Sequence, residues 1–211
     1  KTISEKHGTE FTSSDEMKEF YYQGIEILES IKSNRSSLYP IKNHKLIGIE
    51  IPICYKIDNF DITLIGYIDY VLCDLRNNTH YIVDIKTSYN GWYDTKKKDE
   101  NTLMQLLLYK KYYSIQYNVP IDNINAQFFV VKRKQFSKEQ KENMFPNQLR
   151  KYQEIPIVSG SIKMNQMNKK LNNFLSIFNS DGSIKEGIQF NQCKSEDNCR
   201  WCPYKNTRYC D

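Results

Sequence analysis

A strand-like segment, a long helical segment and a second strand-like run follow one another in the middle of the chain, and this order constrains the fold most. Residues 80–87 read as a strand. Residues 101–117 repeat apolar side chains with the period of about 3.6 residues that is typical of a helix. Residues 126–131 are apolar almost throughout, as expected of a buried strand. A strand, helix, strand passage predicts a crossover and hence a parallel pair of strands.

Two more strand-like segments, residues 46–57 and 62–73, precede this passage. In the first, isoleucine recurs at every second position, at Ile47, Ile49 and Ile51. This alternation is typical of a strand with one buried face. Asn77-Asn78 is a hairpin-like turn between the second segment and the strand at 80–87. Three antiparallel strands are the simplest arrangement, so we expect a mixed central sheet with helices on its faces, an α/β fold.

Helices are also predicted near both ends of the chain. Residues 15–33 follow an N-cap signal and show helical spacing. Residues 162–178 carry apolar side chains on one helical face and end before an Asp-Gly turn. Residues 137–160 carry only a weak signal. We expect one domain over residues 1–190 and a small cysteine-rich tail over residues 191–211.

The composition fits a globular protein and gives no sign of a membrane segment. Hydrophobic residues make up 39% and charged residues 26% of the 211 residues. No run approaches the roughly 18 apolar residues of a membrane helix, and no signal-peptide pattern opens the chain. We therefore expect a cytoplasmic protein, or one in the host cytoplasm if its source is viral. The chain starts at Lys1 rather than Met, which leaves open a natural N-terminus upstream.

Two carboxylates and a lysine lie on neighbouring predicted strands, at Asp69, Asp84 and Lys86. Alternation places Asp84 and Lys86 on one strand face, and Asp69 is within pairing reach. Carboxylates and waters form the oxygen-rich site that Mg²⁺ or Mn²⁺ prefers. Such a metal would polarise a phosphate and lower the pKa of water, and Lys86 would orient that water or balance charge. The alternative is a surface ion pair at the end of a strand.

Three short motifs occur in order and resemble those of a known family. They are Gly66-x-x-Asp69, Asp84-x-Lys86 and Gln105-x-x-x-Tyr109. With them, residues 46–134 resemble the core of the PD-(D/E)XK nuclease superfamily and are most similar to its RecB-like exonuclease branch, which includes phage exonucleases. The resemblance implies a restriction-endonuclease-like fold.

The resemblance also implies roles for individual residues. Asp69 and Asp84 would be metal ligands together with the carbonyl of Ile85, and Lys86 would be the catalytic lysine. The motif on the predicted helix would line the DNA path near the scissile phosphate, through Gln105 and Tyr109.

Two further residues are candidates for the same site. Glu50 lies on the preceding strand, where relatives often have an acidic residue, and its alternative is an exposed strand carboxylate. The branch also uses a histidine on an early helix as a metal ligand, and His7 is the candidate here, although the Gly-x-x-x-His context of the family is absent. His44 and His80 are read as ordinary histidines.

Four of the six cysteines gather at the end of the chain, at Cys193, Cys199, Cys202 and Cys210. Without a secretory signal, such a cluster favours metal ligation over disulfides. Zinc and iron–sulfur clusters both accept four thiolates. Relatives often hold a [4Fe-4S] cluster with one upstream cysteine, whereas here no cysteine precedes Cys54. A cluster, a Zn²⁺ ion and metal-free cysteines remain open, and Cys54 and Cys73 are expected to be buried.

Basic runs point to a polyanionic substrate. Lys96-Lys97-Lys98 and Lys132-Arg133-Lys134 follow predicted strands, and the net charge is +5. Such runs are commonly solvated loops, but beside a metal site they favour binding of phosphates.

These observations predict a metal-dependent deoxyribonuclease, with exonuclease activity expected. The setting would be recombination, repair or phage replication, with DNA and a protein of that process as partners and no membrane. One alternative is a nucleic-acid-binding module with an inactive nuclease fold, which would have lost the carboxylates. Another is an interaction domain organised by metal at the cysteine tail.

Overall fold

The protein is described by a computed structural model over residues 12–39, 42–189, 199, 200, 202, 205 and 207. Its elements follow one another as α2 (Ser14–Ser33), α3 (Arg35–Leu38), β1 (His44–Lys56), β2 (Thr63–Asp74), β3 (Thr79–Ser88), α4 (Asp94–Lys97), α5 (Glu100–Tyr117), η1 (Ile121–Asn123), β4 (Ile124–Lys132), α6 (Lys138–Glu142), α7 (Pro146–Leu149), β5 (Tyr152–Pro156) and α8 (Ser161–Leu175).

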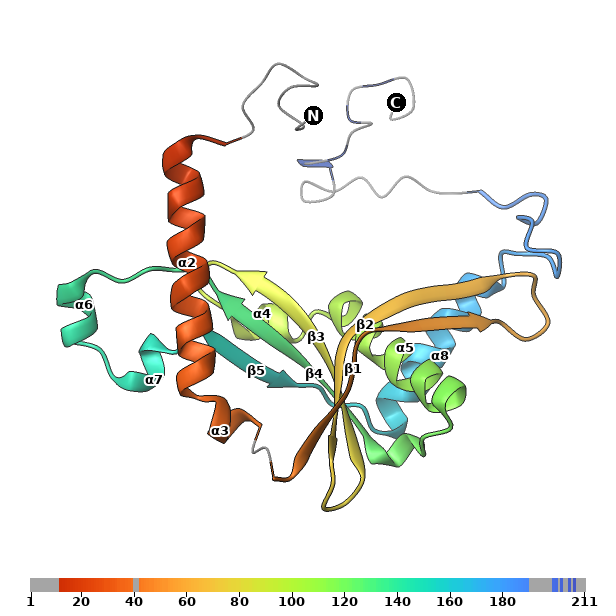
Figure 1. Ribbon diagram of the computed structural model, residues 1–211. Coiled ribbons are helices and arrows are strands. Elements are labelled where there is room, and N and C mark those ends of the chain that lie inside the picture. Colours follow the sequence, from red (N-terminus) through yellow and green to blue (C-terminus); the bar gives the residue numbers. More distant parts are fainter. Residues whose placement is uncertain are drawn as a thin grey trace, which may run out of the picture.

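The strands form one mixed five-stranded sheet in the order β1-β2-β3-β4-β5 (Figure 1). Only β3 and β4 are parallel, and α5 is the crossover between them. The predicted α/β fold with a mixed sheet and flanking helices is therefore confirmed. The fifth strand, β5, lies in the segment where the sequence signal was weak.

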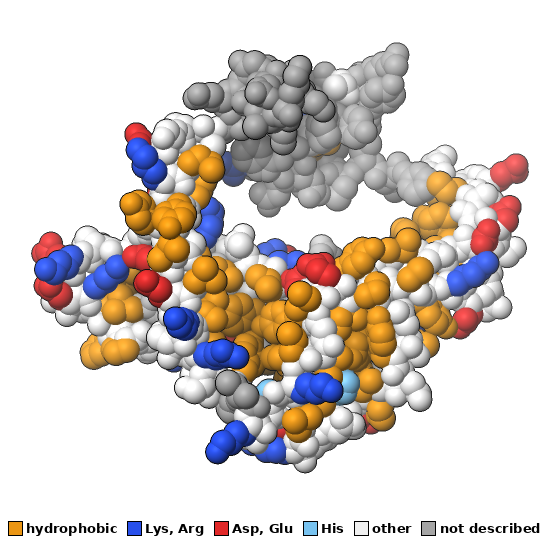
Figure 2. All heavy atoms as spheres, in the orientation of Figure 1, with side chains coloured by type: hydrophobic (Ala, Val, Ile, Leu, Met, Phe, Trp, Pro, Cys, Tyr) orange, Lys and Arg blue, Asp and Glu red, His pale blue; other side chains and the backbone are white. Residues whose placement is uncertain are grey.

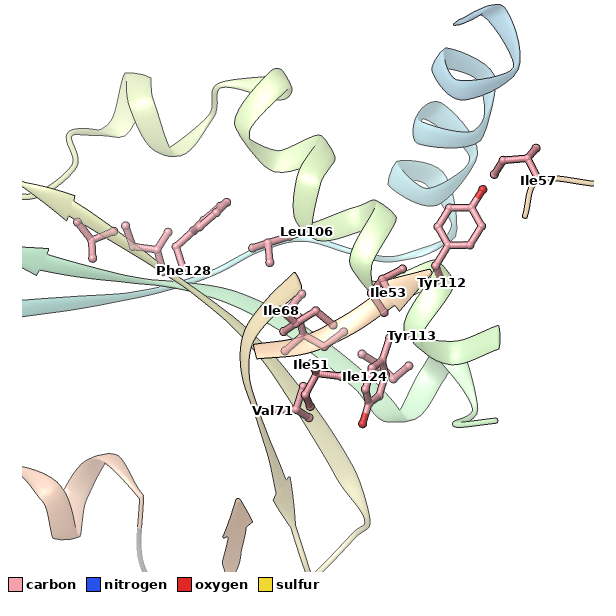
Figure 3. Close-up of a cluster of buried hydrophobic side chains, with 14 of the residues drawn as sticks. Ile51, Ile53, Ile57, Ile68, Val71, Leu106, Tyr112, Tyr113, Ile124 and Phe128 are labelled. Atoms are coloured by element: carbon pink, nitrogen blue, oxygen red, sulfur yellow. The ribbon is translucent and has the colours of Figure 1, made fainter. Parts of the chain in front are cut away.

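Helices cover both faces of the sheet because β3 and β4 are apolar on both sides. On one face, Ile82 and Phe128 are fully buried and belong to one core cluster with Leu106 of α5 (Figure 3). On the other face, Val83 and Phe129 form a second cluster, which includes Leu38 of α3 and, partly buried, Ile31 of α2. The α8 helix packs against the outer side of α5 through Met164 and Met167.

The end of α5 is fixed against the free edge of β1. The Gln116 side chain accepts a hydrogen bond from the Cys54 N–H at 2.9 Å and donates one to the Pro52 carbonyl at 3.0 Å. The Tyr117 hydroxyl donates a second bond to that carbonyl at 2.8 Å. These bonds satisfy groups that an edge strand otherwise leaves open, and they hold α5 in place over the sheet.

The middle of β1 changes its exposed side at Glu50. Ile47 and Ile49 are 42% and 69% exposed, whereas Ile51 and Ile53 are buried in the core. The predicted alternation, with Ile47, Ile49 and Ile51 sharing a face, was therefore wrong. Glu50 has a left-handed backbone with φ of 49°, which is uncommon outside glycine and turns the strand over.

The expected burial of the two isolated cysteines needs one correction. Cys54 is exposed rather than buried, because it follows the buried Ile53 on the outward side of an edge strand, whereas Cys73 is buried as expected.

Apolar side chains of α2 and of the outer face of β1 and β2 stay open to solvent (Figure 2). None of the helices in the described ranges has the length and apolarity needed to cross a bilayer.

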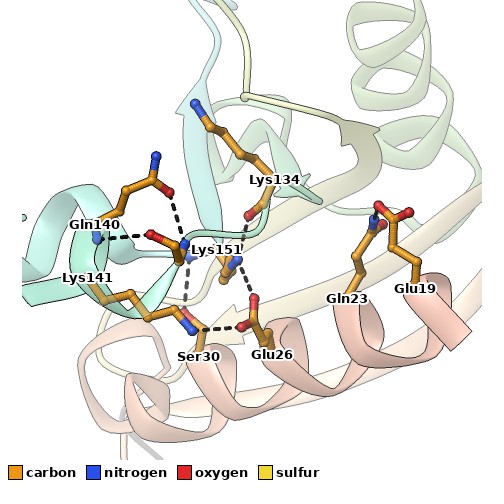
Figure 4. A network of polar contacts seen from close by, with 9 residues as sticks. Glu19, Gln23, Glu26, Ser30, Lys134, Gln140, Lys141 and Lys151 are labelled. Atoms are coloured by element: carbon orange, nitrogen blue, oxygen red, sulfur yellow. Dashed lines mark hydrogen bonds and ion pairs between the residues drawn. The ribbon is translucent and has the colours of Figure 1, made fainter.

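Ion pairs fasten the C-terminal half of α2 to the segments before β5. Figure 4 shows Glu26 of α2 between Lys141 of α6 and Lys151, at 2.8 and 2.6 Å. Lys151 is 5% exposed and also donates to the Lys134 carbonyl. A buried ammonium needs such partners, so this network ties α2 to the segment before β5.

Candidate active site

The site lies where β2 and β3 stop pairing. The ladder between them ends at Tyr70 and Val83, and beyond it β2 pairs only with β1 while β3 continues beside β4. The next position in register would set Asp69 opposite Asp84. There the Asp69 carboxylate accepts the N–H of Ile85. A side chain thus takes the place of a strand partner, and two carboxylates meet at the fork between diverging strands.

Asp84 is a buried carboxylate that forms an ion pair with Lys86 and lies near the charge of Asp69. It is 2% exposed, and its Oδ2 lies 2.8 Å from Nζ of Lys86. The Lys86 side chain is 33% exposed, so it reaches from the buried acid to solvent. Burial raises the pKa of Asp84, the Lys86 ammonium opposes this rise, and the charge of Asp69 adds to it. Because Asp84 is buried, the two side chains do not form a surface ion pair.

Helix α5 brings two more polar side chains to this point. Lys86 Nζ donates to Oε1 of Gln105 at 3.2 Å, and Gln105 Nε2 donates to the Tyr109 hydroxyl at 3.2 Å. Gln105 and Tyr109 are one helical turn apart, so they share a face of α5. The start of the helix is capped by Asp99, whose carboxylate accepts the N–H of Asn101 at 3.0 Å.

The residues at the fork fit a divalent cation with oxygen ligands. Asp84 Oδ2 is buried, and apart from its ion pair no donor among the described residues meets it with hydrogen-bond geometry. The Ile85 N–H points toward Asp69, and in an extended strand the carbonyl of the same residue points to the same side. Mg²⁺ typically takes one or two carboxylates and completes its shell with waters and substrate phosphates.

The described residues at the fork do not supply a complete set of metal ligands. In the described ranges, no three His, Cys, Asp or Glu side chains gather in a way that could hold a metal ion. The two carboxylates and the carbonyl would supply only part of a metal's ligand shell, which suits a metal that shares its ligands with a substrate.

One protein family matches most of the chain. A family profile described as "PD-(D/E)XK nuclease superfamily" matches residues 18–210. The chain belongs to the PD-(D/E)XK nuclease superfamily. No curated protein matches the chain. Among solved structures it is similar to one titled "Crystal structure of SSO0001", at 16% identity and a TM-score of 0.36, over 92% of this chain and 79% of that chain.

Membership of this superfamily suggests a metal-dependent nuclease, and a nuclease fold implies a nucleic-acid substrate. The three motifs of the resemblance lie together in the structure. Gly66 of β2 is in contact with Tyr109 of α5, and Asp69 is three residues further along the same strand, beside Ile85.

Glu50 occupies a position that the superfamily resemblance singled out. Its neighbours Ile49 and Ile51 pair with Tyr70 and Ile68, so Glu50 is opposite Asp69 in register. Its side chain is exposed and makes no hydrogen bond or ion pair with another described residue. A left-handed non-glycine residue costs of order 1–3 kcal/mol, and such strain clusters at functional sites.

Of the five candidate ligands near the ends of the chain, the structure describes two. His7, Cys193 and Cys210 lie outside the described residues. Cys199 and Cys202 are described as free, partly exposed thiols, and the N–H of Cys202 donates to the Cys199 carbonyl at 3.5 Å.

The other two histidines can be placed as well. His80 bonds the Tyr113 hydroxyl at 3.0 Å, on the core side of β3 and four residues before Asp84, and burial lowers its pKa. His44 opens β1 and lies beside the rings of Tyr39 and Tyr81.

The first basic run is partly engaged in local ion pairs. Lys96 pairs with Asp99 at 2.8 Å and Lys97 with Asp94 at 3.0 Å, which is the solvated arrangement that charge runs usually adopt. The second run ends β4 and adjoins two basic residues that sequence reasoning passed over, Arg150 and Lys151. Their adjacency within the weakly patterned segment was the signal available for them.

Proposed function

We propose that this protein hydrolyses DNA phosphodiester bonds with Mg²⁺ or Mn²⁺, and that it acts as an exonuclease. The observation that supports this most is the convergence of Asp69, Asp84 and Lys86 at the fork between β2 and β3, where a buried Asp84 oxygen has no partner among the described residues besides Lys86. That arrangement suits a phosphate held against a cation, because negative charge then meets positive charge on two sides.

The chain's own residues would divide the work between binding and proton handling. Asp69, Asp84 and the Ile85 carbonyl would hold the metal, with Glu50 as a further carboxylate beside them. When bound, the metal would offset negative charge on the phosphate and lower the pKa of a water molecule. Lys86 is held between Asp84 and Gln105, so its ammonium can orient that water and balance the charge that develops on the phosphate.

Gln105 and Tyr109 would line the path of the strand. With Lys86 they form one hydrogen-bonded chain that runs along α5. The ring of Tyr109 packs closely against the backbone of Gly66, and this contact holds the Tyr109 side of the site against β2.

The finer assignments rest on the motif set. The proposal therefore includes membership of the RecB-like exonuclease branch, as a phage-type enzyme. It also includes a role in recombination, repair or phage replication in the cytoplasm, together with a protein partner. A nuclease domain over 1–190 and a tail over 191–211 whose cysteines hold a [4Fe-4S] cluster or Zn²⁺ belong to it as well. Metal and iron analysis of protein purified without oxygen tests the tail directly.

The exonuclease assignment is tested with DNA that lacks ends. Purified protein with Mg²⁺ or Mn²⁺ is incubated with end-labelled linear DNA and with closed circular DNA of the same sequence, both single- and double-stranded. The proposal predicts loss of linear DNA with circles left intact, and the label gives the polarity. Nicking of circles at the rate of linear loss would make the protein an endonuclease instead.

A further inference from the structure

A basic pocket lies at the carboxyl end of β4, beyond the site described above. It has a volume of about 280 Å³. Its lining includes four basic side chains and no acidic one: Lys132, Lys134, Arg150 and Lys151. Tyr93 and Phe136 add aromatic walls. Such a lining is suited to an anion attached to an apolar or aromatic group.

Like charges face each other across this end of the sheet. Lys132 donates its N–H to the Lys151 carbonyl at 2.8 Å, so the two lysines are cross-strand neighbours. Like charges directly opposite each other destabilise a sheet unless something neutralises them. Burial, with added repulsion from Lys151 and Arg150, lowers the pKa of Lys132.

Within the part of the chain that the structure describes, one of the four cations forms an ion pair with a carboxylate. Lys151 pairs with Glu26 at 2.6 Å. Lys132 and Arg150 form no ion pair with a described residue, and Lys134 lies over the ring of Phe136 at 5.4 Å without an acidic partner. Among the described residues, Lys132 and Lys134 therefore lack an acidic partner, and Arg150 has only the nearby charge of Glu154, with which it forms no ion pair.

The pocket adjoins the end of β3, the strand that carries Asp84 and Lys86. Its Lys132 lies on the same sheet face as Lys86, whereas Arg150 and Lys151 reach Tyr152 and Glu26 on the other face. Val130 pairs with Lys86, and Lys132, two positions on, pairs with Ser88 on the same side. Asn90 of the pocket follows Lys86 by four residues. At about 3.3 Å per residue of strand, Lys132 is roughly 7 Å further along the sheet than Lys86. That is about two steps of a nucleic-acid strand at ~3.4 Å per step.

We infer that this pocket binds a phosphate group of the nucleic-acid strand a few nucleotides from the bond that is cleaved. The inference rests on the proposed function for its substrate class. Lys132, Lys134 and Arg150 supply the charge, and Tyr93 provides a ring on which a base can stack. A terminal phosphate and an internal phosphodiester both have this chemistry.

The test removes two of the unpaired charges and leaves the structural lysine in place. Lys132→Gln/Arg150→Gln is compared with Lys42→Gln/Lys45→Gln, which removes two exposed lysines from the opposite end of the sheet, beside the start of β1. All chains carry Lys86→Ala, and thermal melting confirms that each is folded. Binding of fluorescent DNA is measured in Mg²⁺ at several salt concentrations.

If the pocket binds phosphate, the pocket variant should bind DNA more weakly than the parent. The slope of log K against log salt concentration should be shallower by about 2, because each lost phosphate contact removes close to one unit of slope. The control variant should match the parent. Equal salt slopes in the two double variants, or no binding of the parent to any DNA, would overturn the inference. Cleavage that persists in Lys86→Ala would instead contradict the proposed function, since binding is read separately.

Three DNA forms separate the two phosphate sources: linear DNA with a 5′-phosphate, the same DNA with a 5′-hydroxyl, and a single-stranded circle. A loss confined to phosphate-ended DNA assigns the pocket to a terminal phosphate. An equal loss on all three assigns it to an internal phosphodiester.

Discussion

Tyr109 of α5 lies so close to the backbone of Gly66 on β2 that a side chain at residue 66 has no room. A β-carbon there would be 2.8 Å from Cε1 of Tyr109 and 3.4 Å from its hydroxyl oxygen. Glycine in the Gly-x-x-Asp motif is thus a packing requirement: it lets the helix that carries Gln105 and Tyr109 approach the strand that carries Asp69. The backbone of Gly66 is not left-handed, so proximity alone explains the residue.

Gly66→Ala should therefore impair activity more than folding. Tyr109 must move, and with it the contact of Gln105 to Lys86, which we expect to lower cleavage by about 10- to 100-fold. Overpacking should cost about 1–3 kcal/mol of stability. Gly24→Ala is the matched control, because a β-carbon there meets nothing within 4 Å and α2 should gain about 1 kcal/mol. Normal cleavage by Gly66→Ala would show that the contact is unimportant.

The chain from Lys86 through Gln105 to Tyr109 should show graded effects. Tyr109→Phe keeps the ring against Gly66 and removes one neutral hydrogen bond of about 1 kcal/mol, so cleavage should fall by about fivefold. Gln105→Ala frees the Lys86 ammonium and should cost more. Steady-state kinetics on one labelled substrate give the ranking, and a larger loss in Tyr109→Phe than in Gln105→Ala would contradict it.

Metal binding should be visible without any reaction. With Mg²⁺ at about 100 times its Kd, the folded state gains ~2.7 kcal/mol. At about 2–4 °C per kcal/mol, the melting temperature should rise by roughly 5–10 °C. Asp84→Asn keeps the shape of the side chain but removes its charge, so the rise should disappear. Asp122→Asn, an exposed carboxylate on η1, is the control and should keep it; an unchanged rise in Asp84→Asn would place the metal elsewhere.

Acid stability should depend on Asp74. Hydrogen bonds from the Arg76 side chain, the shortest at 2.6 Å, and from the Arg76 N–H lower the pKa of Asp74 to about 2, from a usual 3.8. A carboxyl whose pKa is lowered by folding stabilises the protein above its unfolded pKa, and this stabilisation is lost as the pH falls through the folded value. Urea unfolding of Asp74→Asn should thus show a weaker loss of stability between about pH 4 and about pH 2. A curve parallel to that of the unmodified protein would exclude this pair as a source of acid sensitivity.

The central strands and the crossover helix could be predicted because their patterns are long and uniform. The segment of β4 has five fully or nearly fully buried side chains, and α5 presents Leu106 and Tyr113 to the sheet. The strand β5 has only two buried apolar side chains, Tyr152 and Ile155, three positions apart. Because that spacing breaks the alternation of a strand, local pattern could not reveal it.

The candidate site was predictable in composition but not in geometry. The order of motifs indicated that Asp69, Asp84 and Lys86 would converge. The hydrogen bond between Asp69 and the Ile85 N–H depends on the point where β2 and β3 part, which is a property of the whole sheet. The left-handed backbone of Glu50 is likewise set by its place between an outward Ile49 and an inward Ile51, and nothing local marks it.

Cleavage of linear DNA by the unmodified chain and by Lys86→Ala tests the central claim most directly. The reaction is followed with Mg²⁺, with Mn²⁺ and with EDTA, and Lys169→Ala, an exposed lysine on α8, serves as the matched control. The account predicts metal-dependent cleavage by the unmodified chain and by Lys169→Ala, and a loss of at least about 100-fold in Lys86→Ala. Folded Lys86→Ala that cleaves at the unmodified rate would contradict it.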